Sequence, residues 1–405
     1  MTINFKPTKL SGSVSAVPAS SEAHIKLICA AFSIGRVRNV PFTEDVCATL
    51  DALKSLGLVF DTVGDNVIFR TYHPNRMPII NCGSSVKTLI YFMCLACACI
   101  GNVVATFDGS DKLPKDAIEA LLKVLGAHGI TSDYNGSLPF TIKGSLNSGE
   151  FTLDTEYAED FVTGLIIALS RNNTDSFINV VGGDYPKSGI LLAADILKEA
   201  KVLTASNEDV YIIRGGQSYK LFETTIGGDF ALASNFVVAN AMNSNVRVAG
   251  LDAMSAQPEK TIFEIIRRVQ SSGCKGFDLN CLEIPNLVPI LAVYACSLNG
   301  TTCLCNAKSR SSNSYVDTEL VCDMINSVGG KATALSDRIV IDGVKNLTGG
   351  TIDCRSDHRI ALASAILSTI CTDDVTVLNV ECVAKPYASF LDDYRRVGGN
   401  VTIIN

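Results

Sequence analysis

Residues 87–99, KTLIYFMCLACAC, and residues 102–107, NVVATF, form the most informative stretch of the sequence. The first segment is apolar on nearly every side, which predicts a buried helix, and the second is rich in β-branched residues, which predicts a strand. An amphipathic helix over 115–125 follows, and then a hairpin over 130–142 with Asn135-Gly136 at its turn. This stretch therefore predicts one compact unit of strand, helix, strand, helix and hairpin.

The same unit recurs along the whole chain. Copies over 12–70 and 151–215 complete the first half, and the second half repeats the pattern from Thr224, Gly276 and Gly350. The more apolar helix of each unit is predicted to be buried, whereas the second helix has a charged face. We therefore expect helices inside and sheets outside. The predicted apolar helices outside the first two copies span 159–170, 231–242, 287–298 and 358–371.

Two groups of three units predict an α/β protein with two inside-out domains, each built of three βαβαββ units. The boundary is expected near Lys220, after the polar segment Gly215–Tyr219. The first strand, residues 3–9, precedes the first unit and can pair with the far domain. The first domain is thus predicted to span 10–220, and the second to combine 1–9 with 221–405.

Composition limits the class of protein. The 405 residues are 47% apolar and carry a formal charge of −7, which argues against nucleic-acid binding by bulk attraction. No membrane span or signal peptide is recognised, so a cytoplasmic monomer is expected. The 15 cysteines are expected as free thiols. Cys94 and Cys97 are expected as buried apolar residues, and neither a metal nor a cofactor is predicted.

Three motifs carry a resemblance to a known family: Arg214–Tyr219 (RGGQSY), Asp357–Leu362 (DHRIAL) and Cys382–Tyr387 (CVAKPY). With six units in this order, the chain resembles the 5-enolpyruvylshikimate-3-phosphate (EPSP) synthase family and its enolpyruvyl transferase fold. The resemblance implies transfer of an enolpyruvyl group from phosphoenolpyruvate to shikimate 3-phosphate, a step of aromatic amino-acid biosynthesis through chorismate. It also implies two domains that close around small anionic substrates, such as phosphoenolpyruvate or a phosphorylated sugar-like acid.

The resemblance implies substrate-binding residues at five positions. Their side chains suit two polyanions held side by side, because lysine and arginine bind phosphate and carboxylate groups through charge-assisted hydrogen bonds. For each cation the alternative is a structural ion pair or a solvated surface position. For the histidine it is a structural role at a helix start. The five positions are Arg359, Lys385, Asp357, His358 and Lys26.

Other positions of the family pattern are occupied by residues that do not suit this chemistry. Glu22 stands where a serine is expected, and Ile90 where an arginine is expected. Glu159 and Asp160 replace the run of residues that would bind the phosphate of shikimate 3-phosphate. Asn286 and Ser314 stand where an acid/base pair is expected, and an amide cannot take a proton. The resemblance therefore predicts weak or absent turnover of shikimate 3-phosphate.

Three hypotheses remain open, since fold does not imply function. The chain is an enolpyruvyl transferase, acting on shikimate 3-phosphate or on another acceptor, or a non-catalytic anion-binding or regulatory pseudoenzyme, or a structural member of a larger assembly.

Overall fold

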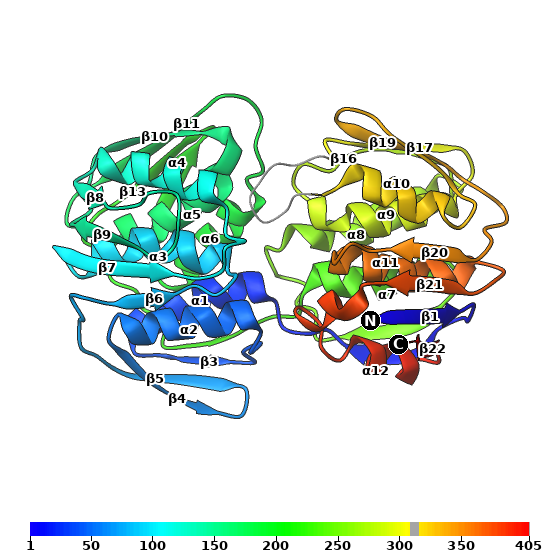
Figure 1. Cartoon of the computed structure of the whole chain (residues 1–405), viewed down its shortest axis with the longest axis horizontal. Coiled ribbons are helices and arrows are strands. Elements are labelled where there is room, and N and C mark those ends of the chain that lie inside the picture. The colour runs from blue at the N-terminus through cyan, green and yellow to red at the C-terminus, as the bar shows by residue number, and fades with distance from the viewer. Residues whose placement is uncertain (308–315, 405) are drawn as a thin grey trace. The chain divides into compact units, whose positions relative to one another are not determined.

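A computed structural model describes residues 1–307 and 316–404. The chain forms two compact units: unit 2 holds Pro18–Gly227, and unit 1 holds Met1–Val17 with the described residues from Gly228 onward. Figure 1 shows the elements of each unit. These limits lie a few residues beyond the predicted boundaries near 10 and 220. The reason is strand pairing, because β2 (Ser11–Ser15) pairs with β15 of unit 1 and β14 (Glu223–Thr225) pairs with β3 of unit 2.

Unit 2 contains three four-stranded sheets with the strand orders β14-β3-β5-β4, β6-β7-β9-β8 and β10-β11-β13-β12. Its helices are α1 (Ser20–Ser33), α2 (Glu44–Ser55), α3 (Val86–Cys99), α4 (Lys115–Gly126), α5 (Ala158–Leu169) and α6 (Ser188–Glu199), with the short 3-10 helix η1 (Thr155–Tyr157). Its strands besides β14 are β3 (Arg36–Arg38), β4 (Leu58–Val63), β5 (Asn66–Tyr72), β6 (Ile79–Asn81), β7 (Val103–Asp108), β8 (Ile130–Ser132), β9 (Phe140–Gly144), β10 (Glu150–Asp154), β11 (Ser176–Val181), β12 (Thr204–Asn207) and β13 (Val210–Ile213).

Unit 1 contains sheets with the orders β20-β21-β1-β22 and β16-β17-β19-β18, and the two-stranded pair β15-β2. Its helices are α7 (Phe230–Ala241), α8 (Ile262–Ser271), α9 (Val288–Cys296), α10 (Thr318–Asn326), α11 (His358–Leu367) and α12 (Phe390–Arg396), with the 3-10 helices η2 (Pro258–Thr261), η3 (Pro285–Leu287), η4 (Ser368–Ile370) and η5 (Val380–Ala384). Its strands besides β2 are β1 (Thr2–Lys6), β15 (Asn245–Ala249), β16 (Asp278–Asn280), β17 (Thr301–Cys305), β18 (Lys331–Ala334), β19 (Arg338–Asp342), β20 (Gly350–Asp353), β21 (Val375–Leu378) and β22 (Asn400–Ile404).

The predicted repeat is confirmed by strand pairing in five units, each with a four-stranded sheet, whereas, within the described residues, the unit expected from Thr224 has only the two-stranded pair β15-β2. In the most informative stretch β6 pairs in parallel with β7, β7 pairs with β9 antiparallel, and β8 closes the edge as a hairpin partner of β9. A parallel pair needs a crossover connection, which α3 supplies between β6 and β7. The first strand also behaves as expected, because β1 pairs antiparallel with β21 and β22 near the end of the chain.

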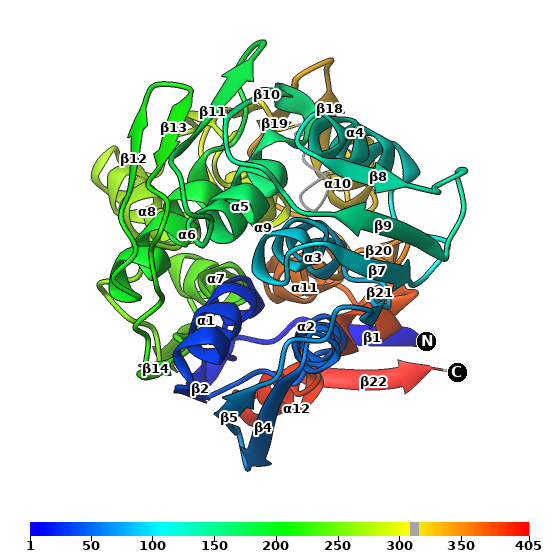
Figure 2. The same ribbon diagram turned by 90° about the vertical axis from the view of Figure 1, so that its left-hand side faces the viewer.

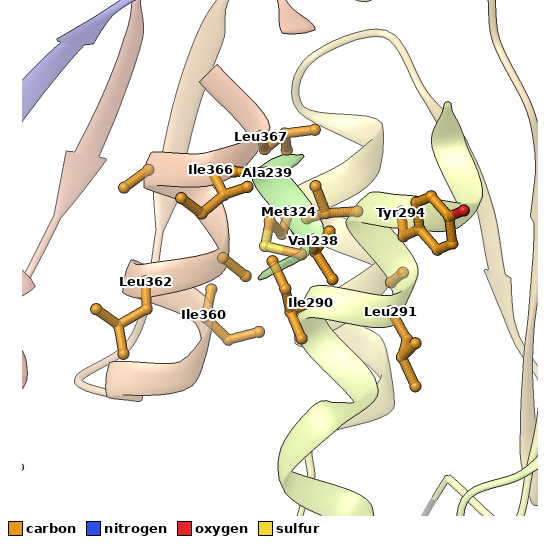
Figure 3. Packing of buried hydrophobic residues seen from close by; sticks show 14 of the residues in the cluster. Val238, Ala239, Ile290, Leu291, Tyr294, Met324, Ile360, Leu362, Ile366 and Leu367 are labelled. Atoms are coloured by element: carbon orange, nitrogen blue, oxygen red, sulfur yellow. The ribbon is translucent and has the colours of Figure 1, made fainter. Parts of the chain in front are cut away.

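Buried helices form the centre of each unit. Figure 2 shows α1, α3 and α5 of unit 2 with strands of the three sheets around them. In unit 1, α7, α9, α10 and α11 contribute to one hydrophobic cluster (Figure 3), in which Ile290, Met324 and Ile366 are fully or almost fully buried. Each Å² of apolar surface that folding removes from water stabilises the folded state by roughly 25 cal/mol. The predicted burial of Cys94 and Cys97 in α3 is confirmed.

Three predictions need correction. The helix expected over 287–298 is shorter, because Leu287 belongs to the 3-10 turn η3 and α9 ends at Cys296 with Ser297 as its C-cap. The helix expected over 358–371 changes to the 3-10 helix η4 after Leu367. The segment Arg214–Tyr219, expected to join the domains, lies inside unit 2. There the buried side chain of Tyr219 lies 3.1 Å from the hydroxyl of Ser170.

Candidate functional site

The start of helix α11 in unit 1 holds three of the predicted residues. Asp357 caps the helix, because its Oδ1 accepts a hydrogen bond of 2.9 Å from the backbone N–H of Arg359. The guanidinium of Arg359 donates from Nε to Oδ1 at 3.0 Å and from Nη2 to Oδ2 at 2.7 Å. This two-point pair holds the planar guanidinium in one orientation. Burial acts to raise the pKa of Asp357, but the hydrogen bonds and charge of Arg359 outweigh it and lower that pKa.

His358 and Lys385 share the electrostatic environment of this pair. Burial, together with the charges of Arg359 and Lys385 and against the opposing effect of Asp357, lowers the pKa of His358 to about 4. The imidazole is therefore neutral near pH 7. Lys385 follows η5 and is exposed. Asp357, His358 and Arg359 thus lie together at the start of α11, and the charge of Lys385 acts on His358.

Asn286, also in unit 1, hydrogen-bonds to a carboxylate. Its Nδ2 donates to Oε1 of Glu259 at 2.9 Å, and Glu259 is only 8% exposed. The 3-10 turn η3 carries the amide, and the 3-10 turn η2 carries the carboxylate. An amide bonded in this way stabilises a buried charge but cannot accept a proton. Nothing in the sequence pattern singled out Glu259, since a glutamate in a 3-10 turn is ordinarily exposed.

In unit 2 the predicted anion ligand Lys26 is already paired. Its Nζ lies 3.0 Å from Oε2 of Glu22, one turn earlier on α1, and donates to the carbonyl of Thr225 at 2.9 Å. Both side chains are well shielded, with Lys26 12% and Glu22 6% exposed. Oε2 of Glu22 also accepts from the N–H of Gly227 at 3.3 Å. The charge of this lysine is therefore balanced by a carboxylate of its own unit.

A second lysine of unit 2 has acidic neighbours too. Nζ of Lys87, at the start of α3, lies 3.9 Å from Oδ1 of Asp160, and Asp160 is 3% exposed. Burial acts to lower the pKa of Lys87, yet Tyr91, Asp160 and Glu159 outweigh it, so that the pKa is raised. The sequence did not suggest Lys87 as a site residue, because its only sequence signal is a charge at the start of an apolar helix.

The carboxylate of Glu159 meets the start of helix α6. Its Oε1 accepts from the backbone N–H of Gly189 at 2.6 Å and from the hydroxyl of Ser188 at 3.3 Å. Helix N-termini favour negative charge through unpaired N–H groups and the helix dipole. Glu159 and Asp160 stand where the run of phosphate-binding residues is expected. They therefore supply carboxylates of the protein itself in place of groups that would bind phosphate. The predicted site residue Ser314 lies outside the described residues.

One cavity of unit 1 lies apart from these residues. It has a volume of about 490 Å³ and is lined between α10 and β20, with Asp323, Asp353 and Arg355 as its charged residues. None of the predicted site residues lines it. Within 1–307 and 316–404, no group of three or more His, Cys, Asp or Glu side chains is arranged to hold a metal ion. No helix in the same ranges has the length and apolar character to cross a membrane.

Comparisons with known proteins agree with this architecture. The solved structure of EPSP synthase from Acinetobacter baumannii superposes with a TM-score of 0.81 at 17% identity, covering 99% of this chain and 100% of that one. At this identity the likeness shows the fold, which is that of the enolpyruvyl transferases.

Sequence comparison identifies the family within that class. The family model for EPSP synthase (3-phosphoshikimate 1-carboxyvinyltransferase) matches residues 5–394. A 3-phosphoshikimate 1-carboxyvinyltransferase from Clostridium kluyveri is 32% identical over 98% of both chains, and one from Clostridium novyi is 30% identical over 98% of this chain and 97% of the other. The chain belongs to the EPSP synthase family.

Proposed function

We propose that this member of the family turns over phosphoenolpyruvate and shikimate 3-phosphate weakly or not at all. The observation that carries the proposal is the internal charge balance of unit 2, where Lys26 is paired with Glu22 and Lys87 lies beside Asp160. A polyanionic substrate would have to compete with these carboxylates for each lysine. Like charges brought close together cost free energy in a partly buried site.

The amide of Asn286 supports the same proposal from unit 1. The family pattern has an aspartate at this position, and here the side chain donates to Glu259 instead of accepting a proton. General acid–base groups typically contribute about a hundredfold to ten-thousandfold to a rate. Loss of such a group, together with neutralised lysines, is enough to remove most of the activity.

A phosphate-release assay tests the proposal directly. This chain and the Clostridium kluyveri relative would be compared with phosphoenolpyruvate and shikimate 3-phosphate at equal enzyme concentration. We expect kcat/KM of this chain to be at least about a hundredfold lower. Circular dichroism on both samples controls for folding. A kcat/KM within about tenfold of the relative, a difference of about 1.4 kcal/mol in transition-state stabilisation, would refute the proposal.

A second candidate function is anion binding without turnover, and the group at α11 favours it. Lys385 is exposed and its charge acts on His358 at the start of α11, while the guanidinium of Arg359 is held in place by Asp357. Titration calorimetry with phosphoenolpyruvate tests this function, with Lys385→Met as the variant and Lys331→Met, an exposed lysine of β18, as the control. Binding that Lys385→Met weakens and Lys331→Met leaves intact supports the function. If the unaltered protein does not bind phosphoenolpyruvate, this second candidate function is refuted.

We further propose that the chain acts as a cytoplasmic monomer. Light scattering coupled to gel filtration checks the oligomeric state, and a dimer mass would contradict it.

A further inference from the structure

The start of helix α6 in unit 2 is crowded by a carboxylate from a different helix. Oε1 of Glu159 accepts from both Ser188 and the N–H of Gly189, the first two residues of α6. Gly189 allows this approach, because a Cβ there would lie 2.6 Å from the same oxygen and 2.9 Å from the carboxyl carbon. Any larger residue would push the carboxylate away. The contact therefore depends on a particular pair of residues, the glutamate and the glycine.

The charged groups around this contact are also balanced within the unit. Asp160, the next residue after Glu159, lies 3.9 Å from Lys87. Lys187, directly before α6, lies 2.7 Å from Oδ1 of Asp209. The donors and cations nearest to the start of α6 are thus engaged by carboxylates of the protein itself. A bound anion would have to displace Glu159 and would meet the charge of Asp160.

We infer that Glu159 is a specificity-determining residue that excludes phosphate from the start of α6. This inference rests on the proposed loss of shikimate 3-phosphate as a good substrate and supplies a cause for it. An internal carboxylate has the advantage over a free anion because it pays no cost of association. Charge-assisted hydrogen bonds of this kind are also stronger than those between neutral groups.

Replacement of Glu159 tests the inference through binding rather than turnover. Inorganic phosphate and shikimate 3-phosphate would be titrated calorimetrically into the unaltered protein, Glu159→Ser and Glu159→Gln. The control is Glu156→Ser, which removes the same charge from an exposed position three residues earlier. We expect Glu159→Ser to bind both ligands at least about tenfold more tightly than the unaltered protein, and Glu156→Ser to leave affinity unchanged.

Glu159→Gln keeps the shape and one acceptor oxygen but removes the charge, so it guards against a folding defect in Glu159→Ser. It is expected to give an intermediate gain in phosphate affinity. The inference is overturned if neither variant gains affinity over Glu156→Ser, or if the unaltered protein already binds phosphate as tightly as Glu159→Ser. These outcomes are separate from the turnover assay, because strong turnover by the unaltered protein would refute the proposed function, whereas the titrations report on Glu159 alone.

Discussion

The two units treat their charged side chains differently. In unit 2, Lys26 and Lys87 lie near carboxylates that are almost completely buried, although Lys87 itself is 27% exposed. In unit 1, Arg359 pairs with a helix-capping aspartate that is still partly exposed, and Lys385 is exposed. Arg359, only 14% exposed, is thus held by Asp357 much as Lys26 is held by Glu22, and the difference between the units lies in Lys385, an exposed cation that a small anion could reach. Three substitutions and one titration would break or sharpen this contrast.

The largest effect is expected from Lys26→Met in unit 2. This change leaves Glu22 buried without its lysine, and breaking a buried pair from one side typically costs about 3 kcal/mol or more. Urea denaturation of the variant should show this loss in the free energy of unfolding. Lys143→Met, at an exposed position of β9, is the matched control and should change stability by less than about 0.5 kcal/mol.

The double variant Glu22→Leu with Lys26→Met extends this test. Removing both charges should recover most of the loss, since an apolar pair of similar volume is tolerated in place of a buried ion pair. If the single variant is as stable as the unaltered protein, the lysine of unit 2 has no structural role and the contrast between the units fails.

The next effect is expected from Asn286→Asp in unit 1. It places a second carboxylate at the position that now donates to Glu259, 2.9 Å away. Repulsion should raise the pKa of one of the two acids in the folded state. The penalty should be small near pH 4 and grow to about 2 kcal/mol at pH 7, because a raised carboxyl pKa destabilises the fold once the unfolded chain ionises.

Denaturation at pH 4 and pH 7 measures this pH dependence, with Asn400→Asp on the exposed face of β22 as the control. Equal stability of Asn286→Asp at both pH values would contradict it. Phosphate release by the same variant adds a second result. A rise in turnover would identify the amide as a cause of the weak activity.

A smaller effect is expected from Asp357→Ala. The change removes a helix cap and the partner of Arg359, for a combined cost of about 1–2 kcal/mol at pH 7. The folded-state pKa of Asp357 is lowered, so its contribution is present above the unfolded value near 4 and is lost as pH falls through the folded value. The difference in melting temperature should therefore shrink towards pH 3. Asp392→Ala, in an exposed pair with Arg395, should show little change at any pH.

The last test is a titration of His358 rather than a substitution. Its pKa of about 4 lies below the ordinary value of 6.5, so it adds stability that is present above pH 6.5 and lost as pH falls towards 4. NMR titration, with the resonance assigned through His358→Gln, should give a midpoint near 4. His24 of unit 2 hydrogen-bonds with Thr49 inside the core and should titrate lower still, at about 3. A midpoint of 6 or above for His358 would show that the start of α11 is open to water.

Much of the fold was accessible from local pattern. The apolar helix and β-branched strand of residues 87–107 predicted α3 and β7 almost to the residue, because helix and strand periodicities are properties of neighbouring residues. The limits of the units were less accessible. They depend on which sheet β2 and β14 join, and that pairing is made with residues far away along the chain.

Some parts of the candidate site could likewise be predicted from the sequence, and others could not. The motif Asp357-His358-Arg359 combines a cap, a histidine and a bidentate partner within three residues, so its geometry was implied by sequence order. The absence of an acid at Asn286 was also visible in the sequence. The pairing of Lys87 with Asp160, of Asn286 with Glu259, and of Glu159 with the start of α6 was settled only by the tertiary structure. Each of these contacts joins separate elements, and an electrostatic interaction depends on distance and burial, which residue order does not specify.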